Sequence, residues 1–206
     1  MLQRPSSGTF IAFEGLDGSG SSTQIALLAD SLEQQGYKVL VVKQPSPNMI
    51  GGLIRGQLTH DWQTSPECLQ LLFAADRAHQ VEREIIPALT NGAVVITDRY
   101  LYSSVAFGQV DGLDKDWLWA INGKVPAPDA VILLKVAPEE CMARINKARF
   151  TQELFEDVEK LRRVWTAYEE IARVVPQCRV IDGQRSKEVV AKDILQIVVP
   201  HLKPAP

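Results

Sequence analysis

The sequence predicts an α/β protein in which helices cover both faces of a five-stranded parallel sheet, giving three layers. Short, nearly continuous apolar runs alternate along the chain with longer segments whose apolar residues recur at helical spacing. Strands that are buried on both faces of a parallel sheet have such continuous runs. No repeat, low-complexity tract or linker interrupts the pattern, so we expect one domain over residues 1–206.

Five apolar runs are the expected strands, at residues 9–14, 37–43, 94–97, 130–136 and 179–182. The expected helices run from residue 22 toward Gly36 and over residues 50–59, 66–90, 102–109, 115–122, 138–149, 155–174 and 187–202. Local signals support several boundaries. Gly36 is a natural stop, Ser65 can cap the helix that follows it, and Pro138 suits a first helical turn.

The composition is ordinary for a globular protein, with 46% hydrophobic and 23% charged residues. A net charge of −3 gives no overall attraction to nucleic acid or to an acidic membrane surface, so any anion site must be local. Cys68, Cys141 and Cys178 are odd in number and far apart, which argues against a disulfide framework or a structural zinc site. Because no apolar run has the length of a signal-peptide core or a membrane span, we expect a cytoplasmic protein.

A glycine-rich turn follows the first apolar run and leads directly into a helical segment. This is the layout of a phosphate-binding loop, in which backbone N–H groups at a helix N-terminus surround phosphate oxygens. Gly15, Gly20 and Ser22 fit the motif G-x-x-x-x-G-K-[ST], whose hydroxyl ligates Mg²⁺. The expected phosphate-binding residues are Gly15, Leu16, Asp17, Gly18, Ser19, Gly20, Ser21, Ser22 and Thr23.

One position of the loop departs from the motif. Ser21 stands where the motif has its lysine, so the loop lacks the usual ammonium on the transferred group. Three interpretations remain open at this point. The chain is an inactive binding protein, or an engineered knock-out, or an enzyme whose cation comes from elsewhere.

Five features occur in one order along the chain, namely FEGLDGSG at residues 13–20, IGGLIR at 50–55, LFAADRA at 72–78, DRYLYSS at 98–104 and PAPD at 126–129. Together they resemble the thymidylate kinases, which transfer the γ-phosphoryl group of ATP to dTMP. The resemblance covers nearly the whole chain, from about residue 9 to 202. It implies the P-loop kinase fold with strand order 2-3-1-4-5, ATP and dTMP as substrates, Mg²⁺ as cofactor, and a homodimer.

The resemblance also implies roles for single residues. Asp17 would face the acceptor nucleotide, and Arg99 would hold phosphate between donor and acceptor. Ser22 and Asp98 would lie on the metal side, although Asp98 could instead cap a helix. The residues implied to contact dTMP are Arg55, Phe73, Arg77, Arg99, Ser104, Phe107 and Tyr168.

Two of these acceptor contacts have a stated chemistry. Phe73 would stack on the thymine, and Arg77, one helical turn later, would hydrogen-bond the base edge. Core packing is the alternative for Phe73 and Tyr168, and solvent exposure is the alternative for Arg77 and Arg55.

In the family, a lid closes over ATP, and the matching segment here is about residues 144–156. The resemblance implies that Arg149 contacts the transferred phosphate and that Arg144 lies on the adenine side of the donor. A solvated basic helix end, favoured by the helix dipole, is the alternative.

We hypothesise that Lys135 replaces the missing loop lysine. It interrupts the apolar run of the fourth strand, where a lysine is costly unless its ammonium finds anionic partners. In the implied strand order this strand lies beside the first, which leads into the loop. The alternative is that Lys135 reaches solvent or pairs with Asp17 or Asp98.

The first functional expectation is therefore an active ATP:dTMP phosphotransferase. A catalytically silent nucleotide-binding protein is the second. A kinase for another nucleoside or deoxynucleoside monophosphate is the third, because Ser104 and Phe107 are not the commonest residues at their positions in the family. We expect no nucleic-acid or membrane partner.

Overall fold

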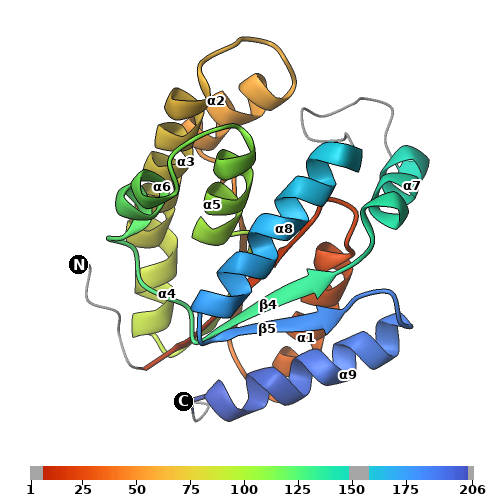
Figure 1. Ribbon diagram of the computed structural model, residues 1–206. Helices are drawn as coiled ribbons and strands as arrows, with labels where there is room; N and C mark the ends of the chain where they lie inside the picture. Colours follow the sequence, from red (N-terminus) through yellow and green to blue (C-terminus); the bar gives the residue numbers. More distant parts are fainter. Residues whose placement is uncertain (1–6, 149–157, 204–206) are drawn as a thin grey trace.

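The structure is a computed structural model that describes residues 7–148 and 158–203. Within these ranges five strands form one parallel sheet in the order β2-β3-β1-β4-β5, which confirms the predicted fold class and strand order (Figure 1). The strands are β1 (Thr9–Gly15), β2 (Val39–Lys43), β3 (Val94–Asp98), β4 (Ala130–Lys135) and β5 (Cys178–Asp182). The helices are α1 (Ser21–Gln34), α2 (Met49–Leu58), α3 (Pro66–Gln80), α4 (Ile86–Thr90), α5 (Leu101–Val110), α6 (Lys115–Asn122), α7 (Pro138–Ala148), α8 (Val158–Val174) and α9 (Lys187–Val198), with a π-helical segment η1 (Val81–Ile85) and a 3-10 turn η2 (Val199–His201).

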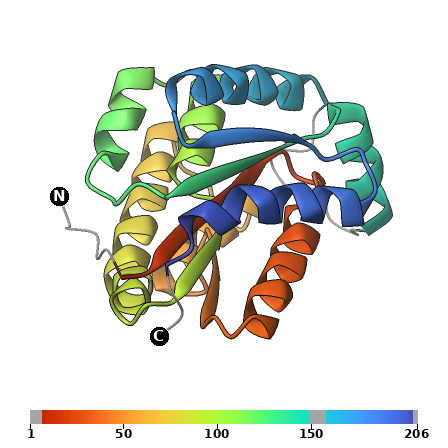
Figure 2. The same cartoon turned by 90° about the horizontal axis from the view of Figure 1, so that it is seen from below.

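Helices form a layer on each face of the sheet. α1 and α9 cover one face, whereas α4, α5 and α8 cover the other (Figures 1 and 2). Ile11 of β1 belongs to the core beneath α1 and α9, together with Leu28 and Ile194. Phe10, one residue earlier, belongs to the core beneath α5 and α8, together with Val164. Because successive side chains of a strand point to opposite faces, β1 is buried on both sides and its sequence is continuously apolar.

Capping side chains and prolines determine where two of the helices begin and end. The long helix predicted at residues 66–90 is present as α3, η1 and α4 in succession, and the Ser65 hydroxyl accepts a hydrogen bond from the Cys68 N–H at 3.3 Å. The last helix ends at Val198 rather than at residue 202, because Pro200 has no N–H with which to continue the helical hydrogen bonds. None of the helices within residues 7–148 and 158–203 combines the length and apolar character needed to cross a membrane.

The parallel register brings polar residues together at the carboxyl edge of the sheet. Lys43 lies opposite Asp98, and Lys135 lies opposite Asp182. Gly15, where the loop begins, lies opposite Leu134. Residues from separate parts of the sequence therefore end at the same edge of the sheet as the loop, where ligands bind in this class of sheet.

Candidate active site

The loop between β1 and α1 depends on glycine at Gly18. The φ angle of Gly18 is +81°, and a Cβ placed there would lie 2.5 Å from the carbonyl oxygen of Cys141 in α7. A side chain at this position would be both strained and in collision with the α7 backbone. Gly20, which has no capping side chain, is the N-cap of α1. The first N–H groups of α1 are therefore left for a ligand, and the helix dipole favours an anion there.

Ser19 provides a second sign that the loop holds a ligand. Its Oγ is buried and has no hydrogen-bond partner among the described residues. A buried hydroxyl without a partner is destabilising, and an oxygen of a bound phosphate would satisfy it.

Asp98 connects the loop to the sheet edge. Its Oδ1 accepts a hydrogen bond from the Ser21 hydroxyl, and its Oδ2 accepts one from the Ser22 hydroxyl, both at 3.2 Å. The Lys43 Nζ lies 3.8 Å from the same Oδ2. The carboxylate is therefore bound by the loop rather than used as a helix cap.

The larger cavity, of about 630 Å³, lies on the acceptor side of the loop. It brings together all but one of the residues predicted to contact dTMP, together with Asp17. The predicted residues that line it are Asp17, Arg55, Phe73, Arg77, Arg99, Ser104 and Phe107.

Arg99 is held between the loop and this cavity. Its Nη2 is 2.9 Å from Oδ1 of Asp17, and its Nη1 donates to the Ser103 hydroxyl at 2.9 Å. Its guanidinium lies 5.4 Å from the centre of the Phe107 ring. Burial alone would lower the pKa of Arg99, but the negative charges of Asp17, Asp98 and Glu14 outweigh burial and raise it. The φ angle of +71°, unusual for a residue with a side chain, marks a backbone that the surrounding structure holds under strain.

Arg77 lines the cavity and is only 1% exposed. Its Nε donates to the Gln44 side chain at 2.8 Å, and its Nη2 donates to the Ser104 hydroxyl at 2.9 Å. Nη1 donates to the side-chain oxygen of Asn122. Burial lowers the pKa of Arg77 to about 10. Arg77 is thus a fixed, buried cation and is not one of the solvated arginines that the sequence left as an alternative.

Tyr168 is placed differently from the expectation. It is 1% exposed, does not line the larger cavity, and its hydroxyl donates to Oε2 of Glu14 at 3.0 Å. The same hydroxyl lies 2.8 Å from the Ser103 Oγ and accepts from Arg99 Nη1 at 3.4 Å. Burial raises the pKa of Glu14, against the lowering effects of Ser103 and Arg99. Tyr168 therefore has a buried hydrogen-bonding role beside Arg99, and its implied contact with dTMP stays a prediction.

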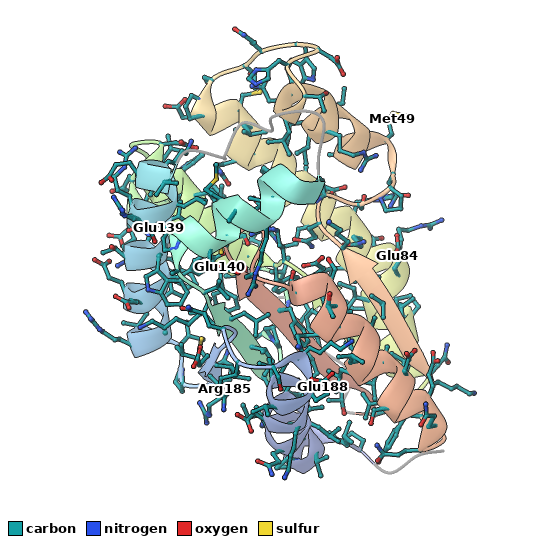
Figure 3. All side chains as sticks on the ribbon, turned by 90° about the vertical axis from the view of Figure 1, so that its right-hand side faces the viewer. Met49, Glu84, Glu139, Glu140, Arg185 and Glu188 are labelled. Atoms are coloured by element: carbon teal, nitrogen blue, oxygen red, sulfur yellow. The ribbon has the colours of Figure 1, made fainter. Side chains whose placement is uncertain are left out.

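A smaller cavity, of about 350 Å³, lies on the donor side of the loop. Arg144 lines it, as do Arg185 and Lys187 from the turn before α9 and its first residue. Arg144 donates to the Gly18 carbonyl at 3.3 Å and pairs with Glu140 at 3.0 Å. Figure 3 shows this side of the molecule, with Glu140 on α7 and Arg185 close to α9. Arg149 and residues 149–156 of the expected lid lie outside the described residues.

The structure does not place Lys135 at the loop, and this hypothesis is corrected. Its Nζ lies 3.7 Å from Glu169 and 5.7 Å from the centre of the Trp165 ring, both on α8. The side chain is 55% exposed, and Lys135 lines neither cavity. Leu134 lines the donor-side cavity instead, because successive residues of β4 point to opposite faces of the sheet.

Sequence reasoning missed several residues of the site. Gln44 and Asn122 hold Arg77, but amide side chains in a turn and at a helix end carry no pattern that indicates such a partner. Gln70 lines the larger cavity, and its Oε1 is buried without a hydrogen-bond partner among the described residues. Glu14 could have been found, because a carboxylate at the end of a fully apolar run needs a buried partner.

Comparisons with known proteins agree with this geometry. The family model described as thymidylate kinase matches residues 13–194. The probable thymidylate kinase of Pyrococcus horikoshii is 41% identical, over 93% of this chain and 96% of its own. That of Pyrobaculum calidifontis is 43% identical, over 92% of this chain and 95% of its own. The structure of thymidylate kinase from Candida albicans has a TM-score of 0.81 at 27% identity, and covers 94% of this chain and 92% of that one. The chain therefore belongs to the thymidylate kinase family.

Proposed function

We propose that this chain transfers the γ-phosphoryl group of ATP to dTMP, giving ADP and dTDP. The observation that carries the proposal is that the larger cavity and the phosphate loop meet at Asp17 and Arg99. Phe73 offers this cavity an aromatic face, and Arg77 offers a buried cation at its wall. A flat base with hydrogen-bonding edges suits these two groups.

The reaction needs positioning more than covalent chemistry. An oxygen of the dTMP phosphate forms a bond to the γ-phosphorus while the bond to the β–γ bridging oxygen breaks, leaving ADP. The loop N–H groups would hold the donor phosphates, and Arg99 would hold oxygens of the phosphates on both sides of the transfer. Its planar guanidinium can grip two oxygens at once. Arg55, which also lines the larger cavity, would bind the phosphate of dTMP.

Mg²⁺ would be held by Ser22 and Asp98. The Ser22 hydroxyl and the Asp98 carboxylate are 3.2 Å apart, and such oxygens are the donors that Mg²⁺ accepts beside substrate phosphates. Among the described residues, no group of three or more His, Cys, Asp or Glu side chains could hold a metal by itself. The remaining ligands would therefore be phosphate oxygens and water. When bound, the ion offsets the negative charge of the phosphates.

A coupled assay of ADP release tests the proposal. With ATP, Mg²⁺ and dTMP, we expect turnover in the ordinary range for such kinases, roughly 1–100 per second. Binding of both nucleotides without ADP release would instead support the silent nucleotide-binding alternative.

A panel of other monophosphates tests the identity of the acceptor. The structure reported for the Candida albicans enzyme is described as revealing the origin of broad substrate specificity, and the acceptor panel for this chain should therefore include dUMP and a ribonucleotide. We expect dTMP to have the highest kcat/KM. A higher value for another monophosphate would reassign the substrate and leave the phosphotransferase activity in place.

We further propose that the enzyme is a homodimer in the cytoplasm. α2 and α3 leave apolar side chains in contact with solvent, with Met49 86% and Leu71 50% exposed. Exposed apolar residues that gather on neighbouring helices suit an interface between proteins. Light scattering should give about twice the chain mass of 22.8 kDa. A mass of one chain at micromolar concentration would contradict the dimer.

A further inference from the structure

The phosphate loop, residues 15–23, contains no lysine, but the end of β2 places the Lys43 ammonium close to Asp98, which binds the loop. We propose that Lys43 supplies the positive charge that the loop lacks at Ser21, by contacting an oxygen of the transferred phosphoryl group. The inference rests on the proposed function. Lys43 is the last residue of β2 and lies opposite Asp98 in the parallel register, with its Nζ 3.8 Å from Oδ2 of Asp98.

The side chains of Ser21 and Lys43 both point toward the carboxylate of Asp98. The Ser21 hydroxyl donates to Oδ1 of Asp98 at 3.2 Å, and the Lys43 ammonium lies on Oδ2. A side chain at position 21 therefore points toward the carboxylate on which the Lys43 ammonium rests. A lysine at position 21 would therefore be directed at the same carboxylate as Lys43.

Lys43 also lies at the cavity that would hold the acceptor. It lines the larger cavity together with Asp17 and Arg99, and through Asp98 it adjoins the loop that would hold the donor. Its ammonium thus lies beside both the acceptor cavity and the carboxylate that accepts hydrogen bonds from Ser21 and Ser22 of the loop. A compact charge on a flexible four-carbon stem can follow an oxygen that moves during transfer.

The ion pair between Asp98 and Lys43 is weak enough for Lys43 to exchange Asp98 for another anion. The Lys43 side chain is 61% exposed, and an ion pair this open to water contributes little stability. A phosphate oxygen with a higher charge density competes well for such an ammonium. Lys43 can therefore leave Asp98 for substrate without disturbing the fold.

Arg99 also lines the larger cavity but is held on Asp17, and three further cations among the described residues lie on the donor side of the loop. Arg144, Arg185 and Lys187 line the smaller cavity on the donor side. Arg144 pairs with Glu140, and Arg185 pairs with Asp193. Each of these side chains can hold donor phosphates or the base, but none lines the cavity that would hold the acceptor. Lys43 has the position that the transfer step requires.

The experiment compares Lys43→Met, Lys43→Arg and the matched control Lys38→Met. Lys38 is an exposed lysine just before β2, at the opposite edge of the sheet. We expect Lys43→Met to lower kcat about 100-fold, the usual effect of removing one group that stabilises transferred charge. KM for dTMP should change less than about threefold. Lys43→Arg should retain most of the activity, and Lys38→Met all of it.

A double-mutant cycle then tests the substitution for the loop lysine. Ser21→Lys should raise kcat at least about tenfold in the Lys43→Met protein. It should change kcat of the wild type little, because one cation is sufficient at this site. Wild-type kcat in Lys43→Met, or the same factor from Ser21→Lys in both backgrounds, would overturn the inference.

A binding measurement separates this inference from the proposed function. The probe is a bisubstrate analogue in which five phosphates join adenosine to thymidine. Lys43→Met should bind it at least about tenfold more weakly than wild type and Lys38→Met. Equal affinities would overturn the role of Lys43 even if the wild type proved inactive. Absence of ADP release from the wild type would overturn the proposed function instead.

Discussion

Replacement of Arg99 by methionine is expected to lower kcat for transfer from ATP to dTMP by about 100- to 1,000-fold. Arg99 is the cation fixed on Asp17 between the loop and the larger cavity, so its loss removes charge at the transferred phosphate. Steady-state ADP release with both substrates saturating measures the effect. Because the Ser103 and Tyr168 hydroxyls lose a donor at the same time, thermal unfolding of the variant should be measured beside activity.

Two further variants define the role of Arg99. Arg99→Lys keeps the charge but loses the planar guanidinium, and should recover only part of kcat. Arg179→Met removes an exposed arginine of β5 and should keep the wild-type rate. Wild-type kcat in Arg99→Met would remove Arg99 from the mechanism.

Replacement of Gly18 by alanine is expected to weaken ATP binding about tenfold or more and to destabilise the protein. The added Cβ would lie 2.5 Å from the Cys141 carbonyl oxygen, so either the loop or α7 must move. The left-handed angle of +81° adds a further cost of about 1–2 kcal/mol for any residue with a side chain. Titration with ATP and thermal unfolding measure the two effects.

Gly112→Ala is the matched control for strain. Its φ angle is +89°, and a Cβ there would meet nothing within 4 Å. Both variants share the backbone penalty, and only Gly18→Ala adds the collision with α7. ATP affinity should therefore fall in Gly18→Ala alone. An equal change in both variants would show that α7 does not shape the loop.

The fold could be predicted because its signals are local and repeated. Continuous apolar runs indicated buried parallel strands, and β1 is indeed buried along its whole length. Ser65 marked the start of α3 through its hydroxyl. Glycines at fixed spacing marked the loop, because few other residues tolerate its backbone angles. Each of these signals depends only on residues that are close in the sequence. The strands, the helix start and the loop that they predict are present in the structure.

Parts of the site could not be predicted because they depend on which face of an element a side chain occupies. Lys135 was expected at the loop, but a strand alternates its side chains, so Lys135 lies on the α8 face and Leu134 on the loop face. Tyr168 was expected at the cavity, but the helix turns it toward the buried Glu14. Lys43 was overlooked because its relation to Asp98 exists only in the register of β2 with β3.

The Ser21 hydroxyl in place of an amine has a consequence for chemical labelling. Acyl phosphates of nucleotides modify proteins by passing their acyl group to a lysine that lies against the terminal phosphates. Residues 15–23 contain no lysine, so the glycine turn offers such a reagent no nucleophilic nitrogen. Such a reagent should instead acylate Lys43, which we propose to contact the transferred phosphoryl group, whereas in proteins whose turn follows G-x-x-x-x-G-K-[ST] it acylates the lysine of the turn.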